Sequence, residues 1–255
     1  MDEADMIGDF WAIYILWLRD LKRYWYDKPR IVASLGQPLL FLFVLGTALS
    51  PNFQGPANIN FSEFIFPGIL AMTVLFTSIF SAISIVWDRE FGFLKEVLVA
   101  PVSRWAIVVG KALGGSTVAV IQGSIMLTLA PLVGVALTPI IVLKTVLAMA
   151  LIAFAVSSLG IVIAARMKEM EGFQMVVNFL IMPLFFLSGA LFPLDRLPAW
   201  LTLLTRIDPL TYGVDLLRGF MLGINTLPLT QDLLVILGFC LVMIATAVFE
   251  FNLAD

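Results

Sequence analysis

Long apolar runs limit what this chain of 255 residues can fold into. The first run has nineteen residues without a charge, and a helix of that length, at about 1.5 Å per residue, crosses a hydrocarbon core of about 30 Å. Backbone N–H and C=O groups find no water inside a bilayer, so each run has to satisfy them within a helix. Six such runs lie at residues 31–49, 64–87, 106–137, 140–165, 173–192 and 233–249. The sequence therefore predicts an all-α integral membrane protein with six transmembrane helices.

Composition agrees with a single membrane domain over residues 1–255. Hydrophobic residues make up 61% of the chain and charged residues only 13%, whereas soluble domains carry about 25% charged residues. The segments between the apolar runs are too short to build a separate globular core. The net charge is −3, and the 15 Lys and Arg mostly flank the runs, so a basic surface for nucleic acid is not expected.

The residue types that support catalysis or metal binding are missing or misplaced. The chain has no histidine, which excludes Ser-His-Asp and Cys-His catalysis, and its single cysteine, Cys240, cannot form an intrachain disulfide. Gly110 and Lys111 lack the upstream glycine and the following Ser or Thr of a phosphate-binding loop. No acidic residue occupies the centre of an apolar run, so a proton relay or an intramembrane protease lacks its carboxylates. We expect no catalytic residue, metal site or cofactor in this chain.

Basic residues predict the orientation of the helices in the membrane. Of the 15 Lys and Arg, eleven lie in the N-terminal region, between the second and third runs up to Lys111, or just after the fourth run. Lys and Arg near transmembrane helices concentrate on the cytoplasmic side. Both termini and the two polar loops are therefore expected in the cytoplasm. The Lys111 side chain, near the start of the third run, is expected to extend to that surface.

The first 30 residues have the pattern of an amphipathic helix that lies flat on the membrane. The aromatic and leucine residues fall on one stripe, namely Phe10, Tyr14, Trp17, Leu18, Leu21 and Trp25. Arg19 and Arg23 lie across from the stripe, where they are expected to meet anionic lipid headgroups. Pro29 is expected to end this helix before the first transmembrane run.

Residues 88–105, DREFGFLKEVLVAPVSRW, form a short polar segment between two long apolar runs. On a helix, Phe91, Leu94 and Leu98 share one face. Arg89 occupies the opposite face. This pattern predicts a short amphipathic helix that offers an apolar ridge to a partner protein. A helix that floats on the lipid surface has the same pattern and is the alternative.

Residues 193–230, between the fifth and sixth runs, are still rich in Leu, Trp, Tyr and Phe, so a solvated loop is not expected. Pro198 and the Asp-Pro pair at 208–209 are typical of helix starts. We expect two short amphipathic or re-entrant helices that lie partly in the bilayer. Asp215 and Arg218 are three residues apart and are expected to form a surface ion pair.

Three polar residues lie within the apolar runs, namely Gln37, Gln122 and Asn178. They could line a path for a polar headgroup, or they could form hydrogen bonds between helices. Gln37 precedes Pro38, and a proline inside a transmembrane helix either bends the helix or lines a path.

Two stretches of the sequence are recognisable as a pair. The first is DREFGFLKEVLVAPVSRWAIVVGKALGG at 88–115, and the second is MPLFFLSGALFPLDRLPAWLTLLTRIDPLTYGVDLLRG at 182–219. In this order and at this spacing they resemble the type-2 export permeases of ATP-binding-cassette (ABC) transporters. The resemblance is closest to the branch of daunorubicin-resistance and nodulation-factor export permeases.

The resemblance implies roles for two sets of residues. The coupling segment, 88–105, would dock on a separate ATPase subunit through Arg89, Glu90, Phe91, Leu94, Lys95, Leu98 and Pro101. A re-entrant hairpin near the outer mouth of the path would contain Ser188, Gly189, Phe192, Pro193, Pro198, Pro209, Tyr212 and Arg218. The N-terminal helix would be the connecting helix of the family.

The resemblance also implies a half-transporter in a bacterial or archaeal plasma (inner) membrane. Two copies of this chain would pair as a homodimer above two copies of the ATPase subunit, which would bind ATP and Mg. The expected function is export of an amphipathic drug, lipid or lipid-linked glycan, and export of a polysaccharide or lipo-oligosaccharide is the alternative. An ATP-independent carrier would need midplane charges or a polar pore lining, which the sequence lacks. A purely structural membrane subunit is a third hypothesis.

Overall fold

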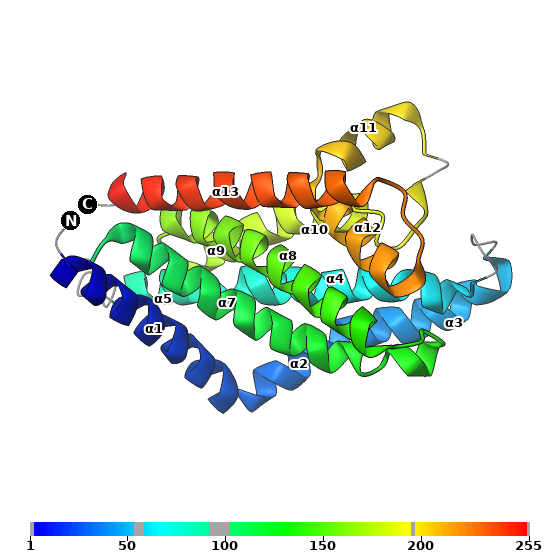
Figure 1. Cartoon of the computed structure of the whole chain (residues 1–255), viewed down its shortest axis with the longest axis horizontal. Helices are drawn as coiled ribbons and strands as arrows, with labels where there is room; N and C mark the ends of the chain where they lie inside the picture. Colours follow the sequence, from blue (N-terminus) through cyan, green and yellow to red (C-terminus); the bar gives the residue numbers. More distant parts are fainter. Residues whose placement is uncertain (1–2, 54–58, 92–101, 195–196, 254–255) are drawn as a thin grey trace.

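The structure of the chain, a computed structural model, is built from helices over the residues it describes, 3–53, 59–91, 102–194 and 197–253 (Figure 1). The helices are α1 (Glu3–Tyr26), α2 (Lys28–Leu40), η1 (Phe41–Leu45), α3 (Gly46–Leu49), η2 (Ser50–Asn52), α4 (Phe61–Ser81), α5 (Ile83–Glu90), α7 (Arg104–Leu127), η4 (Ala130–Val133), α8 (Pro139–Arg166), α9 (Met170–Val176), η5 (Val177–Ile181), α10 (Met182–Leu187), α11 (Ala199–Ile207), α12 (Pro209–Leu222) and α13 (Leu229–Leu253). The elements η1 and η5 are π-helical turns, whereas η2 and η4 are 3₁₀ turns.

Among the described residues, six helical stretches are long and apolar enough to cross a membrane. We number them spans one to six: Ile31–Leu49, Phe61–Glu90, Arg104–Leu127, Pro139–Arg166, Met170–Leu187 and Leu229–Leu253. The prediction of an all-α protein with six transmembrane helices is confirmed.

Two spans end earlier than their apolar runs. The run 106–137 leaves its helix after Leu127, and Gly134, with a φ of 92°, then reverses the chain. In the fifth run the helix ends at Leu187, because Gly189 follows with a φ of 71°. Glycine adopts such positive φ angles without steric cost, so it turns the chain inside an apolar sequence.

Spans two, three and four form the centre of the bundle. Between 61% and 72% of the residues in their apolar stretches are buried, against 17% to 22% in spans one, five and six. Burial is continuous in α4 from Phe64 to Leu75. Both α7 and α8 pack on α4, and α13 lies along α8 (Figure 1). The three outer spans therefore expose apolar side chains, which suit lipid or a second protein.

Prolines accompany the π-turns in spans one and five. In span one, Pro38 lies within α2 and η1 follows it, whereas in span five η5 precedes Pro183. A proline leaves the carbonyl four residues earlier without its helical partner, and a π-turn changes the local register of hydrogen bonds. The interruption expected at Pro38 thus takes the form of a π-turn.

The two ends of the bundle differ. The N and C termini, α5 and the beginning of α7 lie at one end, whereas α3, α11 and α12 lie toward the other (Figure 1). Span two consists of two helices, since the chain turns at Ala82 between α4 and α5. Beyond that turn, α5 carries the chain to the edge of segment 92–101. We call this end of the bundle the coupling end.

The helices α11 and α12 lie between spans five and six, where two short helices were expected. Asp208 caps α12 by accepting a hydrogen bond from the backbone N of Leu210 at 2.9 Å, and Pro209 takes the first helical position. Asp215 and Arg218 are buried inside the bundle, so the expectation of a surface ion pair is wrong. The reason is that α12 packs against α4, α8 and α13 and is enclosed by them.

Candidate functional site

The described part of the predicted coupling set lies at the coupling end. Arg89 and Glu90 close α5, and Phe91 follows with 81% of its surface exposed. Glu90 is exposed as well, so both side chains are open to a partner. Arg89 instead donates a hydrogen bond from Nη1 to the carbonyl oxygen of Met167 at 2.8 Å, which fastens α5 to the loop after α8. The rest of the set lies outside the described residues: Leu94, Lys95, Leu98 and Pro101. The docking role of the set stays a prediction.

The N-terminal helix α1 holds both flanks of the coupling segment. On one flank, the buried Asp9 accepts hydrogen bonds from the backbone N of Ser103 at 2.9 Å and from its Oγ at 2.6 Å. Ser103 is the residue from which α7 begins. On the other flank, Arg19 Nη2 lies 2.6 Å from Asp88 Oδ2 of α5. The chain on either side of residues 92–101 is therefore fixed to the same helix.

The helix α1 packs lengthwise along α7 (Figure 1). The two backbones approach closely at Gly110, where a Cβ would lie 3.1 Å from the Cα of Ile13. Further along, Trp17 Nε1 donates a hydrogen bond to Thr117 Oγ1 at 3.0 Å. The contact between α1 and α7 therefore extends over several turns of both helices.

Two arginines of α1 contact protein. Arg19 pairs with α5, and the guanidinium of Arg23 lies 4.0 Å from the centre of the Trp87 ring. The side of α1 that carries them packs onto the coupling end, and their contact with lipid headgroups stays a prediction. Aromatic side chains of the predicted stripe, among them Phe10 and Trp25, are exposed on the outer side of α1.

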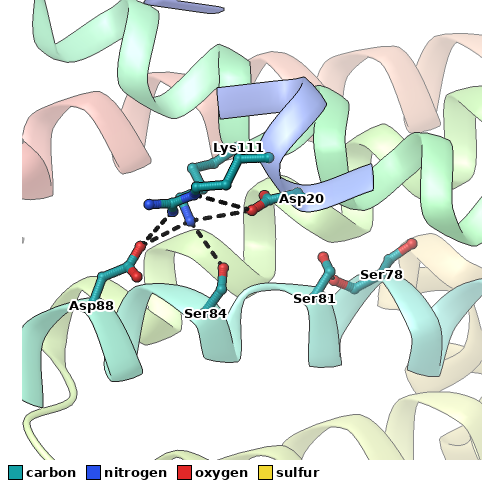
Figure 2. Close-up of polar contacts among 7 residues, drawn as sticks. Asp20, Ser78, Ser81, Ser84, Asp88 and Lys111 are labelled. Carbon is teal, nitrogen blue, oxygen red and sulfur yellow. Dashed lines mark hydrogen bonds and ion pairs between the residues drawn. The ribbon is translucent and has the colours of Figure 1, made fainter. Parts of the chain in front are cut away.

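Four charged side chains meet at the coupling end, and we call Arg19, Asp20, Asp88 and Lys111 the charge cluster. The Nζ of Lys111 lies 3.1 Å from Asp88 Oδ2 and 3.6 Å from Asp20 Oδ1 (Figure 2). It also donates a hydrogen bond to Ser84 Oγ at 3.0 Å. Lys111 is 6% exposed, so the expectation that its side chain reaches the surface is wrong. Carboxylates from α1 and α5 hold the ammonium group inside the bundle.

The charge cluster has two positive and two negative members, of which Lys111 is almost fully buried. Burial raises the pKa of Asp20, and the nearby Lys111 and Arg19 oppose that rise. Removal of one member would leave a buried charge without its counterion, which is far more destabilising than exchange of the whole set for apolar residues. No local spacing in the sequence reveals the cluster, because its members come from three helices that are distant along the chain.

A cavity of about 340 Å³ lies between spans one, two and five. It brings together Gln37 of α2 and Asn178 of η5, which are two of the three residues considered for a path. Its wall is otherwise mostly apolar, with the ring of Phe76 and the hydroxyl groups of Thr73 and Thr77. The path-lining role of Gln37 and Asn178 stays a prediction.

Gln122 joins helices and does not line this cavity. Its side-chain oxygen accepts a hydrogen bond from the Tyr24 hydroxyl. Its Nε2 donates to Ser34 Oγ at 2.9 Å and to the carbonyl oxygen of Ile31 at 3.1 Å. Gln122 thus connects α1, α2 and α7, as the interhelical alternative expects.

The predicted hairpin residues lie between the end of α10 and α12, and one of them, Arg218, is buried. Arg218 of α12 donates from Nη2 to the carbonyl oxygen of Gly189 at 2.9 Å and stacks 4.2 Å from the centre of the Phe64 ring in α4. The Tyr212 hydroxyl donates to the carbonyl oxygen of Arg206 at 2.7 Å and so joins α12 to α11. The remaining members follow the connecting chain: Ser188 and Gly189 after α10, Phe192 and Pro193 in the next loop, Pro198 before α11 and Pro209 at the start of α12. Their role near an outer mouth stays a prediction.

Residues 12–222 match the ABC-2 type transporter family. The chain belongs to this family. It is 31% identical over 192 residues to the transport permease ycf38 of Cyanophora paradoxa, over 74% of this chain and 66% of that protein. It is 28% identical over 195 residues to Nodulation protein J of Rhizobium leguminosarum bv. trifolii, over 76% and 74% of the two chains. It is also 28% identical over 178 residues to the probable multidrug ABC transporter permease YbhR of Escherichia coli (strain K12), over 67% of this chain and 46% of YbhR.

As an ABC-2 permease, the chain is a multi-pass membrane subunit, and members of this family pair with separate ATPase subunits. The resemblance drawn from the stretches 88–115 and 182–219 is confirmed. The matched region runs from α1 to the end of α12, so it contains the charge cluster, both described flanks of the coupling segment and the buried Arg218.

Proposed function

We propose that this chain is the permease subunit of an ATP-driven exporter. The exporter moves an amphipathic substrate (a drug, a lipid or a lipid-linked glycan) out of the cytoplasm or the inner leaflet. The observation that carries this proposal is the construction of the coupling end, where α1 fixes both flanks of the segment between spans two and three. The multidrug description of the relative YbhR fits this class of substrate.

In this proposal the coupling segment docks on an ABC ATPase subunit, which supplies the ATP and Mg sites. Glu90 and Phe91 are open to such a partner at the end of α5. The docking face is completed by Leu94, Lys95, Leu98 and Pro101. Closure of two ATPase subunits on ATP would push the coupling segments and move the spans between inward-open and outward-open states.

The coupling end faces the cytoplasm of a bacterial or archaeal plasma (inner) membrane in this proposal. Both termini lie at that end (Figure 1), so both are cytoplasmic. The excess of Lys and Arg in the N-terminal region and the two polar loops supports this orientation.

Two copies of the chain pair through their outer spans in the proposed exporter. Spans one and five border the 340 Å³ cavity and expose large apolar side chains, among them Val32 and Phe179, which is 87% exposed. A second copy against these spans would join the two cavities into a common path. Apolar walls with a few polar groups, here Gln37 and Asn178, suit an amphipathic substrate because the polar groups orient it while the walls bury its apolar part.

The test uses the chain reconstituted in lipid vesicles with the ABC ATPase that copurifies with it, and a panel of fluorescent drugs and lipids as substrates. Glu90→Ala and Leu94→Asp should abolish ATP-dependent transport and leave the chain folded, because both changes fall on the cytoplasmic docking face. Glu171→Ala, at an exposed acidic residue in the first turn of α9, is the matched control and should transport normally.

Three results would contradict the proposal. Normal transport by Glu90→Ala and Leu94→Asp would show that the docking face is elsewhere. Exchange of substrate by the purified chain without any ATPase would support an ATP-independent carrier, whereas ATPase binding without transport of any substrate would support a structural subunit.

A further inference from the structure

We propose that Lys111 is a positioning residue through which movement of the coupling segment reaches the membrane spans. The inference rests on the proposed function, since it needs an ATPase that moves this segment. Its basis is the charge cluster, which joins α1, α5 and α7 at the coupling end.

The helix α5 is the first element that a push on the coupling segment would move. It has eight residues, and the turn at Ala82 separates it from α4. Lys111 binds α5 through Ser84 and Asp88, which are one helical turn apart on the same side of the helix (Figure 2). Lys111 itself belongs to α7, a continuous helix of 24 residues. Displacement of α5 is therefore passed to α7 along its whole length.

The helix α1 completes this unit. Asp20 approaches Lys111 from α1 at 3.6 Å, and Arg19 reaches Asp88 at 2.6 Å. The ammonium group of Lys111 donates hydrogen bonds to Ser84 and Asp88, and Asp20 is its ion-pair partner beyond hydrogen-bond distance. Lys111 thus binds two helices from a third, which is the arrangement required to keep all three in one register.

A small cavity lies beside the charge cluster, at the junction between α4 and α5. The cavity has a volume of about 30 Å³ and is lined by Asp20, Ser81, Ser84 and Gly115, among others. A space of this size is large enough for one or two water molecules. Ser81 ends α4 just before the turn, and its hydroxyl lies on the same side as that of Ser84 (Figure 2). Water in this cavity can pair with the serine hydroxyls when the turn changes its angle.

Stability alone explains the charge cluster poorly. Buried ion pairs contribute little to stability compared with apolar side chains of similar volume. The geometry of these ion pairs does fix which atoms face one another. A contact that keeps α1, α5 and α7 in one register is therefore the better explanation of the charge cluster.

Lys111→Met is the direct test, because methionine keeps the apolar stem and removes the ammonium group. In vesicles that contain the ATPase, transport should fall about tenfold while ATP hydrolysis stays within about twofold, in line with the size of coupling effects along contiguous networks. Lys111→Arg keeps the charge and should keep the wild-type ratio of substrate moved to ATP hydrolysed. Lys144→Met, in span four where the ammonium lies 5.8 Å from the centre of the Phe220 ring, is the matched lysine control and should also keep that ratio.

The variant Lys111→Met combined with Asp88→Asn removes one charge of each sign, and it serves in the same assay if Lys111→Met alone does not fold. The inference is overturned if the folded variant, Lys111→Met or the double variant, keeps the wild-type ratio of substrate moved to ATP hydrolysed. An equal fall of transport and hydrolysis, shared by Lys111→Arg, also overturns it, because such a fall reports only loss of folded protein. If the wild-type chain itself does not transport with ATP, the proposed function fails, and the two failures are thus distinguishable.

Discussion

Gly68 is where span two meets the turn after span five, and one added methyl group there should destabilise the protein. A Cβ at Gly68 would lie 2.7 Å from both the Cα and the carbonyl carbon of Ala190. Real Cβ contacts stay above 3.0 Å, and the backbone of Ala190 cannot rotate away, so α4 and the turn must separate. Overpacking of this kind costs about 1–3 kcal/mol. The same turn contains Gly189, whose carbonyl accepts the hydrogen bond of the buried Arg218, and its loosening costs about 1 kcal/mol more.

Unfolding of the purified chain in detergent, followed by tryptophan fluorescence, measures this effect. Gly36→Ala is the matched control, since a Cβ at Gly36 in α2 meets nothing within 4 Å. Alanine in a helix should raise stability there by about 0.5–1 kcal/mol. Gly68→Ala should be less stable than this control by about 2–4 kcal/mol. Equal stability of the two variants would refute the packing of the turn on α4.

Four further variants test polar contacts within the chain. Gln122→Leu should lower the free energy of unfolding by about 1–2 kcal/mol because the Tyr24 hydroxyl loses its acceptor. Gln37→Leu should keep the stability and reduce transport. Identical unfolding curves for the two variants would contradict this. Burial raises the pKa of Asp208 to about 7, so the stability linked to its protonation is fully present below about pH 4 and is lost as the pH rises through about 7. The Asp208 carboxyl should therefore make the wild-type chain about 2 kcal/mol more stable at about pH 5 than at about pH 8.5, and Asp208→Asn, which keeps a capping side chain, should lower the pH difference by that amount. Asp9→Ala should speed hydrogen exchange at the start of α7, since Ser103 loses two hydrogen bonds, and unchanged exchange there would count against the anchoring role of α1.

The number and placement of the spans could be predicted from the sequence because a bilayer fixes the length of an apolar helix. Span one, Ile31–Leu49, was predicted to the residue. The ends at Leu127 and Leu187 were not predicted. The chain passes through a 3₁₀ turn, Ala130–Val133, and the turn at Gly134 after the first of them and turns at Gly189 after the second, all within apolar sequence that resembles more helix. Hydropathy records how apolar a residue is and says little about where the backbone turns.

The burial of charged side chains could not be predicted from local sequence patterns. Lys111 looks like a lysine that reaches the surface beside its helix end, and only the approach of α1 and α5 supplies the carboxylates that turn it inward. Arg218 was expected at a surface, yet it donates a hydrogen bond to the backbone carbonyl of Gly189. A pattern of side chains cannot predict a contact with a backbone carbonyl group. Gln122, in contrast, was one of three polar residues that the sequence did single out, and its hydrogen bonds to two other helices agree with the interhelical alternative.

The central claim is that the segment after α5 faces the cytoplasm and is covered by an ATPase. Phe91→Cys, made in a chain that also carries Cys240→Ala, places a single thiol at the exposed edge of this segment. A maleimide that cannot cross membranes should label this thiol in inside-out vesicles only, and bound ATPase should slow the labelling. Labelling from the outer face, or a rate that the ATPase leaves unchanged, would contradict the account.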